Sequence, residues 1–183
     1  QLCVSVERIY VERGAADRFV PAFAERVRNL AVGVDFDYTA DIGSLASAAQ
    51  LTRVTAHLDD AVAKGAKILA GGTARPDLGP YVMEPTVLTD VTTDMDCSTN
   101  ETFGPLVAVT VVDSIDEAVR LANDTSYGLN ASVMSGSRRR AHAVAARLHA
   151  GSINVNEGYR ATFGSIDAPM GGIKQSGLGR RNG

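Results

Sequence analysis

The residues best suited to covalent chemistry in this chain of 183 residues are its two cysteines, Cys3 and Cys97. A thiolate is a strong nucleophile, but a free cysteine has a pKa of about 8.5, so a catalytic thiol needs a site that favours its anion. Two cysteines in a chain of this length do not indicate a disulfide framework. We therefore expect two free thiols in a reducing, cytoplasmic setting, with Cys97 behaving as a small buried hydrophobe.

The three histidines offer no second kind of chemistry. His57, His142 and His149 all fall in stretches with helical periodicity, without cysteine or carboxylate partners at metal-ligand spacing. No metal site is predicted. The basic run at 138–140 lies near the last two histidines, and we interpret this region as a solvated helix face.

Composition excludes two classes of partner. The net charge of −3 gives no reason to expect nucleic acid, which binds to basic surfaces. No apolar run approaches the roughly 20 residues that a membrane-spanning helix needs.

The glycine-rich tail does not contain a G-x-G-x-x-G motif after a strand, so it does not predict a dinucleotide-binding fold of its own.

The elements that must position these residues alternate between strands and helices. Period-two and β-branched patterns predict strands at 4–11, 67–70, 106–112, 131–134 and 152–155, with an extended stretch at 81–88. Helical spacing of apolar residues predicts helices at 15–32, 47–64, 115–123 and 138–148. The apolar run 106–112 is typical of a strand buried on both faces. We therefore predict an α/β fold in three layers, with a mostly parallel sheet, helices on both faces and no dividing linker.

Three further segments stand in a fixed order along the chain. Gln1-Leu2-Cys3 opens it, Glu101-Thr102-Phe103-Gly104-Pro105 precedes the buried strand, and the tail contains Gly151 to Asn156 and then Pro169 to Gly179. Together they resemble the aldehyde dehydrogenase superfamily over nearly the whole chain. The resemblance implies that Cys3 is the nucleophile, that Glu101 accepts hydrogen bonds from the nicotinamide ribose, and that Phe103 packs near the nicotinamide. It also implies NAD or NADP as cofactor.

The reaction implied by this resemblance is oxidation of an aldehyde to a carboxylic acid through a thiohemiacetal and a thioester on Cys3. In the family, the dinucleotide-binding half, the general-base glutamate and an oxyanion-binding asparagine lie upstream of the thiol. We therefore expect residues 1–183 to be a single catalytic-domain fragment, inactive alone, from an enzyme that forms homo-oligomers at full length. Glu7 and Glu101 are not convincing replacements for the missing base.

The loop around 156–172 suggests the substrate. With residues 1–11, it looks most like bacterial succinate-semialdehyde dehydrogenases, and an anionic substrate needs hydrogen-bond donors. Arg160, Thr162 and Ser165 lie in this loop and are the candidate substrate-binding residues; an ordinary polar loop is the alternative.

Two other functions stay open. The chain could be a non-catalytic fragment that only folds or binds, or it could come from a related thiol-dependent reductase of acyl phosphates or thioesters. The residues before Gln1 would distinguish them, since the reductase does not need the water-activating glutamate.

Overall fold

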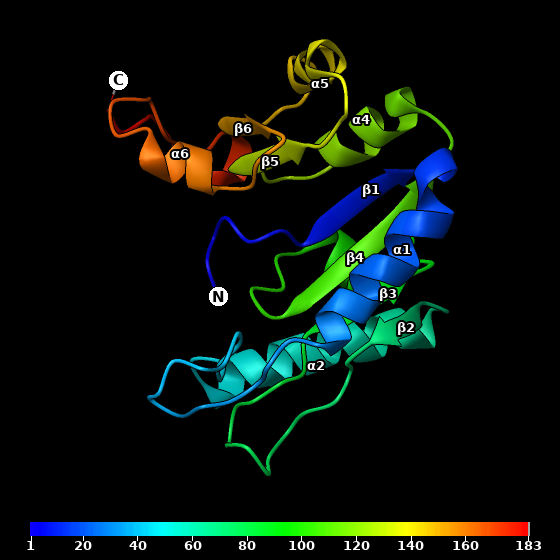
Figure 1. The fold of residues 1–183 in the computed structure, drawn as a ribbon, viewed down its shortest axis with the longest axis vertical. Helices are drawn as coiled ribbons and strands as arrows, with labels where there is room; N and C mark the ends of the chain where they lie inside the picture. The colour runs from blue at the N-terminus through cyan, green and yellow to red at the C-terminus, as the bar shows by residue number, and fades with distance from the viewer. Residues whose placement is uncertain (183) are drawn as a thin grey trace. The chain divides into compact units, whose positions relative to one another are not determined.

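The computed structural model describes residues 1–182, which divide into two compact units. The first unit contains Gln1–Leu2 and Val6–Val112, and the second contains Cys3–Ser5 together with the residues from Asp113 onward. Figure 1 shows the elements of both units along the chain. Each unit has its own sheet, which the sequence patterns had not separated.

The first unit is built on a four-stranded sheet of order β1-β4-β3-β2. Its strands are β1 (Arg8–Glu12), β2 (Lys67–Ala70), β3 (Thr86–Thr89) and β4 (Leu106–Val112). Strand β4 lies inside the sheet and pairs parallel with both β1 and β3, whereas β2 is an antiparallel edge strand. The predicted α/β fold with a mostly parallel sheet is therefore confirmed.

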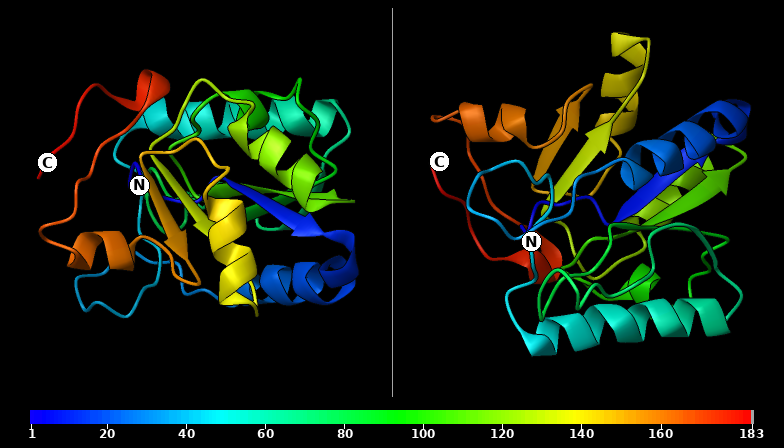
Figure 2. Two further views of the ribbon diagram at one scale, coloured as in Figure 1. Left: turned by 90° about the horizontal axis from the view of Figure 1, so that it is seen from above. Right: turned by 60° about the horizontal axis from the view of Figure 1, so that its bottom comes forward.

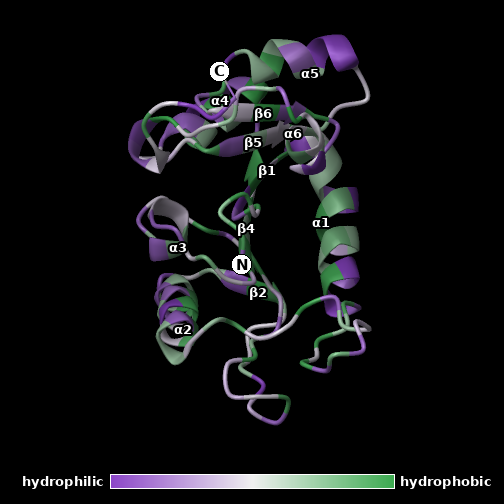
Figure 3. Cartoon of the chain, turned by 90° about the vertical axis from the view of Figure 1, so that its left-hand side faces the viewer, coloured by the Kyte–Doolittle hydropathy of each residue, from purple (hydrophilic) through white to green (hydrophobic). Residues whose placement is uncertain are grey.

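Helices cover both faces of this sheet, as Figure 3 shows with α1 on one side and α2 on the other. Helix α1 spans Arg13–Arg28 and α2 spans Ala48–Ala63. Neighbouring strand residues point to opposite faces of a sheet. Val87 therefore packs with Val27 of α1 in one buried apolar cluster (the α1 cluster), and Leu88 packs in a second cluster that contains Val54 and Leu58 of α2 (the α2 cluster). Both side chains are fully buried, so the sheet forms the middle of three layers.

The predicted helix bounds need correction at 15–32. Helix α1 begins at Arg13 and ends at Arg28, with Asn29 as its C-cap. Phe19, placed on the apolar face by its spacing, is 38% exposed and stacks against Phe23. Helix α2 agrees with the prediction, and Ser47 caps it by accepting a hydrogen bond from the Gln50 amide. Val62, however, is 45% exposed and does not lie on the buried face of α2.

The second unit contains a two-stranded parallel sheet and short helices (Figure 2). These are α4 (Ile115–Asn123), β5 (Asn130–Val133), α5 (Arg138–Ala145), β6 (Ser152–Val155), α6 (Arg160–Gly164) and a 3-10 turn at Lys174–Ser176. Ser114 caps α4 by accepting a hydrogen bond from the Glu117 amide. Helix α5 is shorter than predicted, and β5 begins one residue earlier.

Three local predictions were incomplete. The strand predicted at 4–11 begins only at Arg8, because residues 3–5 form a turn and bend. The short helix α3 (Asp96–Thr99) was not predicted, since a single turn carries no periodic signal. The tail contains the short helix α6, for which no helix was predicted.

The glycine pair of the tail is needed for close packing and not for an unusual backbone angle. A Cβ on Gly151 would lie 1.6 Å from the Gly171 carbonyl oxygen, and one on Gly171 would lie 2.5 Å from the Gly179 oxygen. Neither glycine of the pair 171–172 has a positive φ.

Within residues 1–182, no helix combines the length and apolar character needed to cross a bilayer.

Candidate active site

The two thiols lie in opposite environments. Cys3 is exposed in a turn at the start of the chain, whereas Cys97 is buried in α3 within the α2 cluster. Burial, together with the nearby Asp60 charge, raises the pKa of Cys97 to about 11. Because the thiolate is the nucleophile, Cys97 is inert near neutral pH. Of the two cysteines, only Cys3 offers a thiol to a substrate.

Cys3 groups with the second unit by its contacts, although its sequence neighbours Gln1–Leu2 group with the first. The unit that holds the thiol therefore also holds α6 and the glycine-rich tail. This unit contains all three residues predicted to bind substrate.

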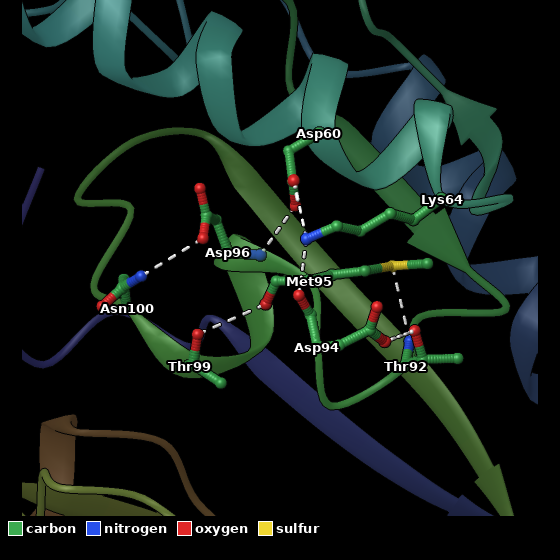
Figure 4. Close-up of polar contacts among 8 residues, drawn as sticks. All are labelled: Asp60, Lys64, Thr92, Asp94, Met95, Asp96, Thr99 and Asn100. Carbon is green, nitrogen blue, oxygen red and sulfur yellow. Dashed lines mark hydrogen bonds and ion pairs between the residues drawn. The ribbon is translucent and has the colours of Figure 1, made fainter.

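The Glu101–Phe103 segment follows α3, and α2 fastens α3 in place. The Asp60 carboxylate accepts a hydrogen bond from the Asp96 amide at 2.8 Å and forms an ion pair with Lys64 at 2.7 Å. Lys64 also donates to the Asp94 carbonyl oxygen at 2.6 Å. Figure 4 shows these contacts converging on the turn before Asn100. Lys64 and Asp96 lower the pKa of Asp60 by hydrogen bonding to its carboxylate.

The peptide groups of Thr102 and Phe103 are held by a carboxylate. The two oxygens of Glu7 accept hydrogen bonds from the Thr102 amide at 2.9 Å and the Phe103 amide at 2.8 Å. Phe103 has a φ of +54°, in the left-handed region that few residues other than glycine adopt. Such strain persists only where the surroundings over-determine the backbone.

Side-chain amides hold the carbonyl groups of the same two residues. Gln50 donates to the Thr102 oxygen at 2.7 Å and to the Phe103 oxygen at 3.0 Å. Gln1 donates to the Phe103 oxygen at 2.9 Å, while its own oxygen accepts from the Ala46 amide. All four backbone polar atoms of Thr102 and Phe103 are therefore bonded to side chains.

Glu101 itself faces solvent. Partial burial, and then the charge of Glu7, raise the pKa of its carboxyl group, while Arg53 acts in the opposite direction. Within residues 1–182 its carboxylate accepts no hydrogen bond, so its acceptor oxygens remain available. An exposed carboxylate with open acceptors fits a ribose diol, because paired hydroxyls need paired acceptors. The residues of this segment thus fit the nicotinamide nucleotide that the resemblance implies.

The three candidate substrate-binding residues differ in what they can still donate. Thr162 donates its hydroxyl to the buried Asn154 side chain at 2.9 Å, and Ser165 donates to the Ala161 carbonyl oxygen at 2.8 Å. Arg160 is exposed at the start of α6. Because both hydroxyl donors are used within the protein, the guanidinium of Arg160 is the main donor available to an anion.

Sequence reasoning missed the side chains that hydrogen-bond the Glu101 segment, namely those of Glu7, Gln50 and His57, and the charge of Arg53 that acts on Glu101. Two of them carry a signal that could have found them. Glu7 is a charged residue directly before the strand β1, and His57 lies at helical spacing with Val54, Leu58 and Ala61 on the buried face of α2. No cluster of metal-ligating side chains occurs in residues 1–182. Lys174 donates to the carbonyl oxygens of Asn123 and Thr125, which is a structural role.

Comparison with known proteins gives a match over the whole chain. The model described as "Aldehyde dehydrogenase family" matches residues 1–183. A protein of Mycolicibacterium smegmatis named "Putative succinate-semialdehyde dehydrogenase [NADP(+)]" is 57% identical over 183 residues, which is 100% of this chain and 35% of that protein. A "Probable succinate-semialdehyde dehydrogenase [NADP(+)]" of Sinorhizobium fredii is 43% identical over 98% of this chain and 36% of its own length.

Solved structures give the same result. Betaine aldehyde dehydrogenase of Staphylococcus aureus in complex with NAD+ is 36% identical, with a TM-score of 0.90, over 98% of this chain and 36% of that one. Succinate-semialdehyde dehydrogenase of Burkholderia pseudomallei is 40% identical, with a TM-score of 0.88 and the same coverage. The chain therefore spans about a third of the length of the relatives that it matches.

Proposed function

This chain belongs to the aldehyde dehydrogenase family, and from that membership we propose that it is the thiol-bearing part of an enzyme that oxidises an aldehyde to the carboxylic acid with NAD or NADP. In this proposal residues 1–183 are one catalytic-domain fragment, and the dinucleotide-binding half lies outside them. The length of the relatives supports this, because the chain covers 35% of the Mycolicibacterium smegmatis protein.

Cys3 is the proposed nucleophile. Its thiolate attacks the carbonyl carbon of the aldehyde, so that a C–S bond forms, the C=O π bond breaks, and a thiohemiacetal results. The Cys3 backbone N–H is one donor for the developing oxyanion. Loss of hydride from the thiohemiacetal carbon leaves a thioester, which water hydrolyses to the acid and the free thiol. The observation that carries this assignment is that Cys3 is exposed, whereas Cys97 is buried and keeps its proton.

Glu101 and Phe103 are the proposed cofactor contacts. When bound, the nicotinamide cofactor supplies the hydride acceptor for the oxidation. Glu101 accepts hydrogen bonds from the ribose hydroxyls through its exposed carboxylate, and the Phe103 ring packs beside the nicotinamide. The fixed backbone of residues 102 and 103 supports this role, because it holds both side chains at set positions.

Succinic semialdehyde is the proposed substrate. The names of the 57% and 43% identical relatives support it. The exposed Arg160, in the same unit as Cys3, supplies the cation that would pair with the distal carboxylate of this aldehyde. Thr162 and Ser165, whose hydroxyls donate within the protein, then shape the substrate-binding loop around Arg160. In the complete enzyme we expect a cytoplasmic homo-oligomer.

The deciding experiment replaces the thiol in the enzyme that contains residues 1–183. Cys3→Ser should abolish oxidation of succinic semialdehyde, and Cys97→Ser should keep most of the activity. Retained turnover in the Cys3→Ser variant would overturn the proposal. Turnover of an acyl phosphate or thioester in place of the aldehyde would favour the reductase.

The chain of 183 residues assayed alone should show no turnover with either cofactor. The proposed general base and most of the cofactor site lie outside it, and loss of such a base costs roughly 10²–10⁴ in rate. Steady NADH or NADPH production by the purified chain would place a base among these residues.

A further inference from the structure

Among residues 1–182, Glu7 is the only charged side chain that accepts hydrogen bonds from the backbone of the Glu101–Phe103 segment. One oxygen accepts from the Thr102 amide and the other from the Phe103 amide, at 2.9 and 2.8 Å. Both bonds are charge-assisted, which makes each about twice as strong as a neutral one. The Glu7 backbone is fixed as well, because its carbonyl oxygen accepts from the amide of Ala108 in the inner strand β4.

The contact acts on a strained residue. Phe103 is left-handed at +54°, a conformation that costs a residue with a side chain about 1–2 kcal/mol. Two neighbouring N–H groups that point at one carboxylate fix the orientation of both peptide planes. The side chains that leave these planes on either side are Glu101 and Phe103. Glu7 is therefore placed to set the direction in which both side chains point.

We infer that Glu7 is a positioning residue for cofactor binding, acting by holding the Thr102 and Phe103 amides so that Glu101 and Phe103 present a preformed surface to the nicotinamide ribose. The inference rests on the proposed function. Glu7 is not a catalytic residue, because it contacts the protein backbone and not the reacting atoms.

The chemistry of Glu7 makes the role specific to a carboxylate. Glutamine has one acceptor oxygen, so in a Glu7→Gln variant one of the two amides would meet an NH₂ group that cannot accept. Aspartate is one methylene shorter and cannot keep both contacts. A side chain that served only to fill space would be replaced by glutamine at little cost.

The test uses the enzyme that contains residues 1–183, with Glu7→Gln, Glu7→Ala and Glu12→Gln as variants. Glu12 is a matched control, since it is exposed at the end of β1 and makes no side-chain cap to α1. Three quantities are measured: the Kd of NAD or NADP by calorimetry without aldehyde, amide hydrogen exchange at residues 101–105 without cofactor, and the thermal midpoint.

Both Glu7 variants should raise the cofactor Kd on the order of tenfold, as expected when a hydrogen bond to a charged group is lost. They should also speed exchange at residues 101–105 in the cofactor-free protein, while the KM for the aldehyde stays near that of the Glu12→Gln control. Glu7→Gln should lie between the wild type and Glu7→Ala.

An unchanged cofactor Kd would overturn the inference even if exchange or the thermal midpoint changes, because Glu7 would then act on stability alone. A raised Kd with unchanged exchange at 101–105 would also overturn it, and so would failure of both variants to fold. Glu101→Gln separates this inference from the proposed function. If that variant leaves the Kd unchanged, the cofactor role of the segment fails; if it raises the Kd while the Glu7 variants do not, only the role of Glu7 fails.

Discussion

The imidazole Nδ1 of His57 and the hydroxyl oxygen of Thr102 lie 3.0 Å apart, and both residues are buried. This hydrogen bond joins the middle of α2 to the segment that carries Glu101. The His57 contact fixes the side chain of Thr102, whereas Glu7 and Gln50 fix the peptide groups of the same residue. The candidate cofactor segment is therefore anchored from α2 as well as from the residue before β1.

Thr102→Val should lower the free energy of unfolding by about 1–3 kcal/mol, because the substitution keeps the shape but leaves His57 with an unpaired buried nitrogen. Urea unfolding of the chain measures the change. The control Thr52→Val removes an exposed hydroxyl on α2, and its free energy of unfolding should stay within about 0.5 kcal/mol of the wild-type value. Replacing both partners, as in His57→Phe with Thr102→Val, should cost less than the sum of the single changes. An additive cycle would show that the two groups do not interact.

Alkylation should distinguish the two thiols in the folded chain. At neutral pH iodoacetamide should modify Cys3, with Cys97 reacting at least roughly tenfold more slowly, since Cys97 is buried and its raised pKa keeps it protonated. Mass spectrometry of the peptides gives both rates. In denaturant the two rates should converge, and equal rates in the folded chain would contradict the burial of Cys97.

The free energy of unfolding should fall as the pH rises from about 8.5 to about 11. In this range Cys97 ionises in the unfolded chain but stays protonated in the folded chain. Its pKa is about 11 in the folded chain, against an ordinary value of about 8.5. Between these values the folded state keeps a proton that the unfolded state has lost, so raising the pH favours unfolding. Thermal midpoints from pH 8 to 11 should therefore decline more steeply for the wild type than for Cys97→Ala. Parallel curves would show that other groups account for the decline.

Gly104→Ala should destabilise the chain by about 1–3 kcal/mol, because its Cβ would lie 2.3 Å from Cγ2 of the fully buried Val54. Gly14→Ala is the control, since no heavy atom lies within 4 Å of its Cβ position and α1 gains a better helix former. In a Val54→Ala background the clash is removed, so Gly104→Ala should lower the free energy of unfolding by less than it does in the wild type. If Gly104→Ala unfolds at the same urea concentration as the wild type, the turn does not pack tightly against Val54 of α2.

The elements that the sequence predicted well are those set by local patterns. The apolar run of β4 and the helix after Ser114 agree residue for residue with their predicted bounds, because hydrophobic periodicity and a capping side chain act within a few residues. The parallel pairing in the sheet followed from the alternation of strands and helices. Exposed residues at apolar spacing, such as Phe19 and Val62, depend on how far each helix reaches along the sheet, which no local pattern encodes.

The candidate site divides in the same way. Cys3, Glu101 and Phe103 were found through motifs that remain together in the sequence. Glu7 and Gln50 contact Thr102 and Phe103 across 95 and 52 positions, and only the folded sheet brings them together. The roles proposed for the motif residues remain predictions, whereas the contacts that hold the 101–105 segment are features of the structure.

The parallel pairing of β1 with β4 also has a consequence for how the chain acquires its structure. Arg8 pairs with Ala108, at nearly opposite ends of the first unit, and no nearer strand bonds to β1 within residues 1–182. Contacts between such distant residues form slowly, because the whole intervening chain must be ordered first. At about 5–20 residues per second, a ribosome needs roughly 5–20 s to synthesise the chain from β1 to β4. During that time β1 has no partner strand, so its backbone N–H and C=O groups stay open to pairing with another chain until β4 has been synthesised.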